Sequence, residues 1–181
     1  GCYGDCGICF TDDEELAAAL DSIRVNGKGS HKYDNARIGI NGRLDTLQAA
    51  ILLAKFDIFP EEVQLRQEVA NRYTALLDGA SVRPPHIPPD DLSVWAQYSV
   101  LAKDEAHRAA LLKSLQEAKI PAAIYYPKPL HLQTAFAALG YAPGAFSVSE
   151  DAANRIFSLP MHPYLQKEDQ MKIAEIMKRA C

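Results

Sequence analysis

Apolar residues recur at helical spacing directly after a glycine-spaced run that carries Asn41 and Arg43. The positions that share one face are Leu44, Leu47, Ile51, Ala54 and Ile58. This spacing predicts a helix with one buried stripe. Asn41 and Arg43 then lie just before a helix N-terminus, where backbone N–H groups and the helix dipole favour an anion. The same residues also fit an ordinary surface loop that leads into a core helix, so the pattern alone leaves both interpretations open.

The rest of the chain is predicted to alternate between helices and short strands. Residues 11–14 are typical of a capping box, and the helix that follows ends at Asn26-Gly27. Residues 27–40 form a long polar loop, which indicates a functional or a solvated segment. Further helices are expected at residues 59–79, after Asp104, and near 132–138, 147–157 and 167–179, with strands near 4–11, 93–102 and 120–125. This order predicts a small α/β layer with one sheet covered on one side.

Composition and charge exclude some classes of protein. The 181 residues are 48% hydrophobic and 23% charged, which is typical of a globular chain. A formal net charge of −4 argues against nucleic-acid binding, which needs a basic face. No apolar run is long enough to span a bilayer, and no signal peptide opens the chain, so a cytoplasmic location is expected. A start at Gly1 without methionine suggests a piece of a longer protein.

Three of the four cysteines lie close together, as Cys2, Cys6 and Cys9. This spacing resembles the three-cysteine motif that holds an iron–sulfur cluster in radical enzymes. A radical enzyme needs a β/α barrel downstream, however, and no such alternation follows. The histidines are scattered singly, so no zinc site is completed. We therefore expect no metal site and interpret these cysteines as small buried apolar residues, with Cys181 exposed at the end of the chain.

Four stretches of the chain carry a resemblance to a known family. They are Gly1-Cys2-Tyr3-Gly4-Asp5, residues 39–52 (GINGRLDTLQAAIL), Tyr126-Pro127-Lys128-Pro129-Leu130-His131 and Ser158-Leu159-Pro160-Met161-His162-Pro163. In this order and spacing they resemble the second half of DegT/DnrJ/EryC1/StrS proteins, the nucleotide-sugar aminotransferases that use pyridoxal phosphate. The resemblance implies the C-terminal part of an α/β, fold-type I aminotransferase. Residues 1–58 would be the end of the large cofactor-binding domain, and residues 59–181 the small C-terminal α/β domain.

The resemblance also implies roles for two residues before the apolar helix. In the family, the asparagine that matches Asn41 reaches across a homodimer with shared active sites to the cofactor phosphate. The arginine that matches Arg43 lies beside the substrate, where its planar fork suits a carboxylate or a phosphate. The alternative for Arg43 is a structural ion pair with Asp34 or Asp45. The Schiff-base lysine of the family precedes the motif at Gly1, so this chain alone is expected to be inactive.

Four further residues are candidate substrate contacts. Tyr125 stands where many relatives have a histidine, so acid–base chemistry is in doubt there while a hydroxyl remains for binding a sugar. His131 belongs to a family motif, although a single histidine between prolines also fits a purely structural role. His31 and Tyr33 lie on the long polar loop.

The function that the resemblance implies is transfer of an amino group from glutamate to a nucleotide-linked keto-sugar. The sequence of residues 31–48 most resembles that of family members that act on UDP-linked 3-keto uronic acids. Such members would serve the synthesis of surface polysaccharide or lipopolysaccharide. Two alternatives remain: a pyridoxal phosphate-dependent sugar dehydratase of the same family, in which a histidine replaces the lysine, and a non-catalytic dimerisation fragment.

Overall fold

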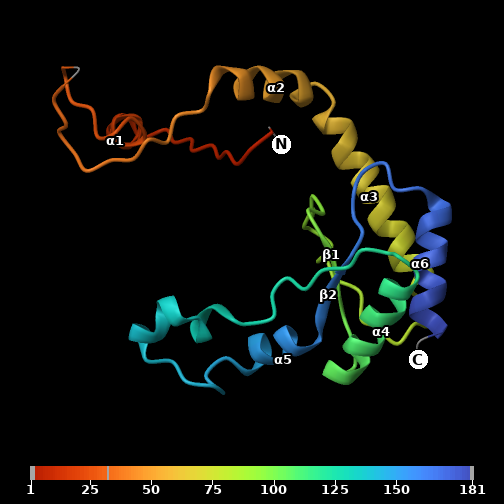
Figure 1. Ribbon diagram of the computed structural model, residues 1–181. Coiled ribbons are helices and arrows are strands. Elements are labelled where there is room, and N and C mark those ends of the chain that lie inside the picture. Colours follow the sequence, from red (N-terminus) through yellow and green to blue (C-terminus); the bar gives the residue numbers. More distant parts are fainter. Residues whose placement is uncertain (1–2, 32, 180–181) are drawn as a thin grey trace. The chain divides into compact units, whose positions relative to one another are not determined.

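The computed structural model describes residues 3–31 and 33–179 (Figure 1). The chain divides into two compact units, unit 1 over Gly1–Pro60 and unit 2 over Glu61–Cys181. That unit 1 is the end of a large cofactor-binding domain and unit 2 the small C-terminal domain stays a prediction. Within the described residues, no helix has the length and apolar character needed to cross a membrane. The elements in order are α1 (Glu14–Arg24), α2 (Thr46–Phe56), α3 (Phe59–Leu76), β1 (Tyr98–Leu101), α4 (Glu105–Glu117), η1 (Leu130–Leu132), η2 (Thr134–Leu139), α5 (Ser147–Arg155), β2 (Ile156–Leu159) and α6 (Lys167–Arg179).

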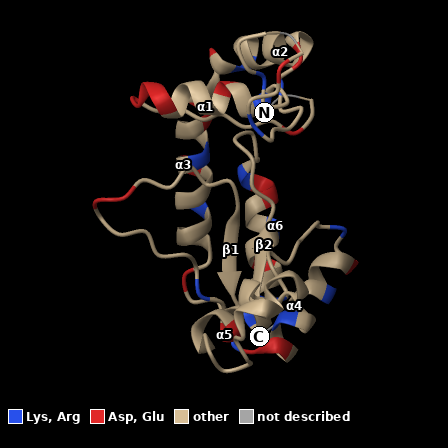
Figure 2. Ribbon diagram, turned by 90° about the vertical axis from the view of Figure 1, so that its left-hand side faces the viewer, with Lys and Arg blue, Asp and Glu red and all other residues tan. Residues whose placement is uncertain are grey.

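The first helix of unit 1, α1, starts directly after a residue that caps its N-terminus. The carboxylate of Asp13 accepts a hydrogen bond from the Leu16 N–H at 3.0 Å, and Glu14 and Glu15 follow in the first turn, where negative charge suits the helix dipole. These acidic residues are red at the start of α1 in Figure 2. The predicted first helix is confirmed, but the predicted capping box is wrong: the N-cap is Asp13, and Thr11 accepts from the Asp13 N–H instead of capping the helix.

Two sequence predictions for unit 1 are wrong about burial. The apolar stripe of α2 contains no buried residue, and Leu47 is 80% exposed. Cys6 and Cys9 are exposed rather than buried, and the described part of residues 1–13 contains no strand. The physical reason is the same in both places: an apolar helix or an extended segment is buried only when another layer covers it, and residues 3–31 and 33–60 supply none. Cys2 and Cys181 lie outside the described residues.

Unit 2 is built on a short antiparallel pair of strands. β1 pairs with β2 in a register that joins Tyr98 to Leu159 and Leu101 to Ile156. Single bridges extend the sheet at both edges, from Arg83 to Leu101 and from Ala123 to Ser158. The predicted strand at 93–102 is therefore only four residues long, and the one predicted at 120–125 is reduced to a bridge.

The end of α5 differs most from the sequence prediction. The helix expected over residues 147–157 ends at Arg155, and the next four residues form β2. Phe157 and Leu159 are almost completely buried, and so is Ser158 between them, so β2 lacks the alternation of a half-buried strand. Periodicity cannot separate such a strand from the end of a helix. A strand of the central sheet was therefore missed.

Three helices cover the strands and form the core with them. Figure 1 shows α3, α4 and α6 gathered beside β1 and β2. The buried apolar residues of these helices, together with Leu77 just after α3, pack against the strand residues Tyr98, Val100, Phe157 and Leu159. The helix residues are Val69, Ala70, Tyr73, Leu111, Leu115, Ile173, Ala174 and Met177. Mixed helix and sheet packing of this kind agrees with the predicted α/β class.

A buried polar network joins α3 to α6. Gln170 is completely buried; its amide oxygen accepts from Arg72 Nε at 2.7 Å, and its amide nitrogen donates to the Val69 carbonyl at 2.9 Å. Arg72 also donates to the Leu165 carbonyl at 3.2 Å. Both ends of the Gln170 amide are thus satisfied, which is the condition under which a buried polar group stabilises a core.

Replacing Gln170 by alanine should destabilise the protein by about 2–4 kcal/mol, because it leaves Arg72 Nε without its acceptor and opens a cavity. Denaturant unfolding of the intact protein measures this free energy. The exposed Gln166, just before α6, provides the control: Gln166→Ala should change the unfolding free energy by no more than about 0.5 kcal/mol. Equal losses in the two variants would contradict the network's role.

Candidate functional site

Backbone hydrogen bonds fix the segment that carries Asn41 and Arg43 to the end of α1. The Ile40 N–H donates to the Ile23 carbonyl at 2.8 Å, and the Gly42 N–H donates to the Arg24 carbonyl at 2.8 Å. These two bonds lie on either side of Asn41. The position of Asn41 in unit 1 is therefore set by backbone contacts rather than by its own side chain.

The side chains of Asn41 and Arg43 contact each other. Arg43 Nε donates to the Asn41 side-chain oxygen at 3.0 Å, and both residues are exposed. Because a guanidinium can only donate, it must face the amide oxygen, which leaves the Asn41 NH₂ group to donate elsewhere. No ion pair involves Arg43 in the part of the chain that the structure describes. The alternative of a structural ion pair with Asp34 or Asp45 is thus not what the structure contains.

The long polar loop folds back on itself. Lys28 and Asn35 form an antiparallel bridge, and the Asn35 side chain donates to the Asn26 carbonyl at 2.6 Å. His31 and Tyr33 lie between these bridged residues and are exposed; Tyr33 is 88% exposed. The loop therefore holds both residues in solvent in unit 1, where their role as substrate contacts stays a prediction.

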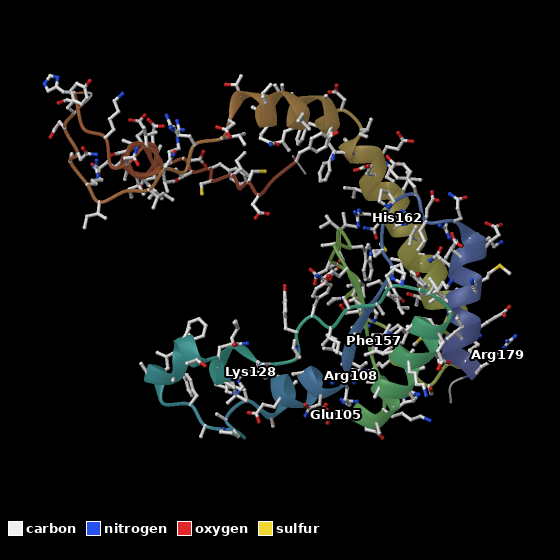
Figure 3. All side chains as sticks on the ribbon, viewed as in Figure 1. Glu105, Arg108, Lys128, Phe157, His162 and Arg179 are labelled. Carbon is white, nitrogen blue, oxygen red and sulfur yellow. The ribbon has the colours of Figure 1, made fainter. Side chains whose placement is uncertain are left out.

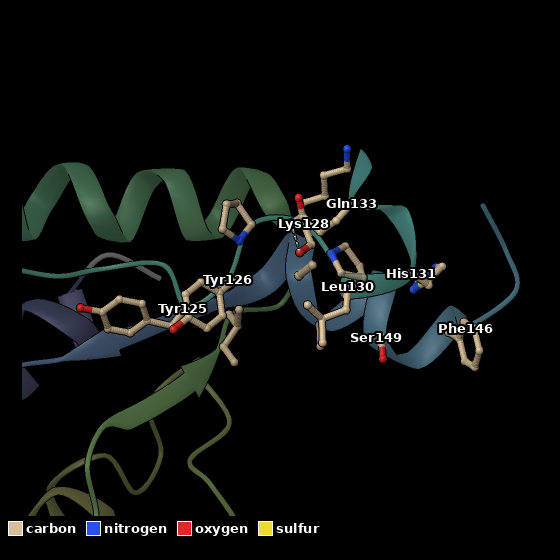
Figure 4. Close-up of a pocket in the computed structure, with 13 residues that line it drawn as sticks. Tyr125, Tyr126, Lys128, Leu130, His131, Gln133, Phe146 and Ser149 are labelled. Carbon is tan, nitrogen blue, oxygen red and sulfur yellow. Dashed lines mark hydrogen bonds between the residues drawn. The ribbon is translucent and has the colours of Figure 1, made fainter. Parts of the chain in front are cut away.

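Unit 2 contains a cavity of about 690 Å³ between the 125–133 segment and α5 (Figure 4). Its polar lining residues are Tyr125, Tyr126, Lys128, His131, Gln133 and Ser149. The rings of Tyr125 and Tyr126 are 5.5 Å apart between centroids, and Tyr125 is 40% exposed. The structure thus brings together Tyr125 and His131, the two predicted contacts of unit 2, at one cavity.

Two arginines hold the wall of this cavity in place. Arg108 of α4, labelled in Figure 3, donates to the Ala153 carbonyl of α5 at 2.6 Å. Arg155, the last residue of α5, donates to the Ala102 carbonyl at 3.2 Å and pairs with Asp151. Both contacts fix the C-terminal end of α5, so the cavity is attached to the sheet and to α4.

His131 is bound to a carboxylate that the sequence analysis did not identify. His131 Nε2 lies 3.0 Å from Glu150 Oε1, and only 8% of the His131 side chain is exposed. Glu150 also accepts from the N–H groups of Gly144 at 2.9 Å and Phe146 at 3.3 Å. The Gly144 hydrogen bond, opposed by partial burial and assisted by His131, lowers the pKa of Glu150 below its usual value near 4.5. No spacing rule links residues 19 positions apart, so the sequence carried no signal for this pair.

The two groups of side chains differ in the ligand chemistry that they suit. Within residues 3–31 and 33–179, no three His, Cys, Asp or Glu side chains gather as metal ligands. Unit 1 offers an amide donor and a guanidinium at one exposed point, which suits an anion. Unit 2 offers hydroxyls, an imidazole and aromatic rings around a cavity, which suits a molecule rich in hydroxyl groups.

Comparison with known proteins finds relatives that match nearly the whole chain. A 45% identical relative, over 91% of this chain and 44% of its own length, is UDP-2-acetamido-2-deoxy-3-oxo-D-glucuronate aminotransferase of Pseudomonas aeruginosa. A DegT DnrJ EryC1 StrS aminotransferase from Brucella abortus is 49% identical in sequence and matches 99% of this chain and 47% of its own with a TM-score of 0.90. DesV of S. venezuelae is 29% identical, with a TM-score of 0.85 over 93% of this chain and 45% of its own.

These relatives settle the fold and the family. The chain spans about half the length of the relatives that it matches, which agrees with the predicted C-terminal portion of a fold-type I aminotransferase. The sequence profile of the DegT/DnrJ/EryC1/StrS aminotransferase family matches residues 2–178. The chain therefore belongs to this family, whose enzymes depend on pyridoxal phosphate.

Proposed function

We propose that this chain is part of an aminotransferase that moves an amino group from glutamate to a nucleotide-linked keto-sugar. The observation that carries the proposal is the pairing of Asn41 with Arg43, which leaves an amide NH₂ group and a guanidinium facing solvent next to the start of α2. These are donors for a phosphate and for a second anion. The family membership supplies the reaction class.

The residues present fit one side of a pyridoxal phosphate site. The Asn41 NH₂ group has no partner among the described residues, so it is available to a phosphate oxygen. When bound, the cofactor supplies the electron sink for amino transfer, and the protein supplies binding and orientation.

Apolar residues exposed on different sides of α2 support assembly into a homodimer. Leu47, Leu53 and Phe56 are 80%, 72% and 71% exposed, and an apolar surface of this kind on a protein typically marks an interface. We propose that a second copy covers it and that Asn41 serves the active site of that copy. A solution molar mass equal to that of one chain, at concentrations where the enzyme is active, would contradict this.

For the substrate, we propose a UDP-linked 3-keto uronic acid, used in the synthesis of surface polysaccharide. The name of the Pseudomonas relative supports this choice. Arg43 is the candidate partner for the uronate carboxylate, because a planar guanidinium binds a carboxylate through two parallel hydrogen bonds.

Replacing Arg43 by methionine should raise KM for the UDP-keto-uronate by about 10–100-fold, the effect of losing a charged hydrogen bond. For the matching UDP-keto-hexose, which lacks the carboxylate, KM should change little. Steady-state kinetics with the two substrates measures the difference. Arg37→Met, an exposed arginine in the same loop, serves as control and should leave both values unchanged. An equal rise in KM for both sugars would remove Arg43 from the carboxylate site.

The proposed function is tested by following the amino nitrogen. The intact protein, loaded with pyridoxal phosphate, is incubated with ¹⁵N-labelled glutamate and the UDP-keto-uronate. We expect a labelled amino-sugar nucleotide by mass spectrometry. A product that lost a hydroxyl without gaining nitrogen would favour the dehydratase alternative, and no product from a protein that binds both cofactor and sugar would contradict both reactions.

A further inference from the structure

The carboxylate of Glu150 gathers hydrogen-bond donors from separate parts of the chain. Its oxygens accept from the N–H groups of Gly144 and Phe146, just before α5, and from Nε2 of His131 in η1. The lowered pKa of Glu150 keeps the carboxylate ionised at neutral pH, so it can only accept. His131 Nε2 must therefore carry a proton.

The other ring nitrogen of His131 is then an unprotonated acceptor in the neutral ring. Nδ1 has no hydrogen-bond partner among the residues that the structure describes. Nδ1 is also not fully buried. Among the described residues, the one fully buried side-chain nitrogen or oxygen without a hydrogen-bond partner is Arg155 Nε. His131 lines the cavity of unit 2, and the Phe146 ring lies 4.8 Å from the imidazole between centroids. Nδ1 is thus an accessible acceptor on a ring held from two sides.

We propose that Glu150 is a positioning residue: it holds His131 in the Nε2–H tautomer, so that Nδ1 accepts a hydrogen bond from a sugar hydroxyl in the cavity. The claim that Glu150 fixes the tautomer of His131 depends only on the geometry of unit 2. The assignment of the ligand as a sugar rests on the proposed function.

A carboxylate suits this position better than an amide. Glu150 serves three N–H donors, from Gly144, Phe146 and His131, and Oε1 takes part in all three contacts. A glutamine has one oxygen with two lone pairs, and its own NH₂ group needs an acceptor. A glutamine could still place its one oxygen at the Oε1 position, where Phe146 and His131 both donate, so Glu150→Gln does not test the tautomer. Glu150→Ala removes all three acceptor contacts and leaves the imidazole free to exchange between the Nε2–H and Nδ1–H forms.

The first measurement is the tautomer of His131 in the intact protein, read from the ¹⁵N chemical shifts of its ring. The wild-type protein should show the Nε2–H form alone, and Glu150→Ala should show a mixture of the two neutral forms. Asp151→Ala makes the matching truncation at the next residue, which pairs with Arg155 rather than His131, and should leave the tautomer unchanged. A wild-type Nδ1–H ring, or a ring whose tautomer is the same in Glu150→Ala as in the wild type, would overturn the proposal. The wild-type measurement tests the proposal even if a variant does not fold.

The second measurement is the affinity for UDP-2-acetamido-2-deoxy-D-glucuronate, the 3-hydroxy analogue of the proposed substrate, by calorimetry. Loss of the fixed acceptor at Nδ1 should weaken binding about tenfold in Glu150→Ala and not in Asp151→Ala. Unchanged affinity in Glu150→Ala would overturn the role of Nδ1. An Nε2–H ring in a wild-type protein that does not bind the analogue would instead support control by Glu150 and contradict the proposed function.

Discussion

Gly39→Ala is expected to displace the segment that carries Asn41. A Cβ atom at residue 39 would lie closest to the amide nitrogen of Gly27, and 2.6 Å from the carbonyl oxygen of Ile23. Both are backbone atoms, so the two chain segments must separate. The hydrogen bonds that join Ile40 to Ile23 and to Asn26, each 2.8 Å long, are the first to be lost. Losing two backbone hydrogen bonds costs about 1–3 kcal/mol locally.

The consequence for function is a loss of affinity for pyridoxal phosphate on the order of tenfold to a hundredfold. Hydrogen exchange at the Ile40 and Asn26 amides should speed up in parallel, which ties the loss to this loop. Gly7→Ala is the matched control, because a Cβ atom at residue 7 would meet nothing within 4 Å. Cofactor titration of the two variants decides the matter: equal affinities would show that residues 39–43 do not hold the phosphate.

Asn41→Asp is expected to be worse for cofactor binding than Asn41→Ala. Alanine removes one neutral hydrogen-bond donor, which costs about tenfold in affinity. Aspartate also points a negative charge at the phosphate, and like charges a few ångströms apart repel by at least about 1 kcal/mol even in water. We therefore expect Asn41→Asp to lose on the order of a hundredfold.

The ranking is measured by titrating pyridoxal phosphate into the intact protein and its variants. The exposed Asn154 of α5 offers the same change of charge elsewhere, so Asn154→Asp should bind the cofactor as tightly as the wild type. The reverse ranking, with aspartate tolerated and alanine not, would mean that Asn41 faces a donor rather than a phosphate.

Local signals in the sequence were sufficient for the capped helices. Asp13 and Asp104 each precede an apolar periodicity, and in the structure each carboxylate accepts from the third N–H that follows, at Leu16 and His107. Capping acts within one turn, so a single stretch of sequence contains all of its determinants. The helix over Lys167–Arg179 was predicted for a similar reason, since its apolar face repeats over three turns.

Features that depend on a second segment were harder to predict. The α2 stripe was expected to be buried, but burial depends on the layer opposite, which residues 3–31 and 33–60 do not provide. β2 was missed because all but the first of its residues are buried, so it shows no alternation. Glu150 was missed because its role depends on His131 and on two backbone N–H groups. The sequence around Glu150 does not indicate any of these contacts.

The candidate site shows the same division. The family motifs pointed to Asn41, Arg43, Tyr125 and His131, and the structure joins these as two pairs, Asn41 with Arg43 by a hydrogen bond and Tyr125 with His131 at one cavity. Which ligand each pair binds stays a prediction. A resemblance carries residue identities, whereas the tautomer of a ring or the direction of an amide follows only from its neighbours in space.

The most direct test of this account is a crystal structure of the intact protein with pyridoxal phosphate and UDP-2-acetamido-2-deoxy-D-glucuronate bound. We expect the Asn41 side-chain nitrogen about 2.9 Å from a cofactor phosphate oxygen, and Arg43 paired with the uronate carboxylate. A phosphate held entirely by other residues, with Asn41 and Arg43 left in solvent as they are here, would contradict the central claim that this segment forms one side of the active site.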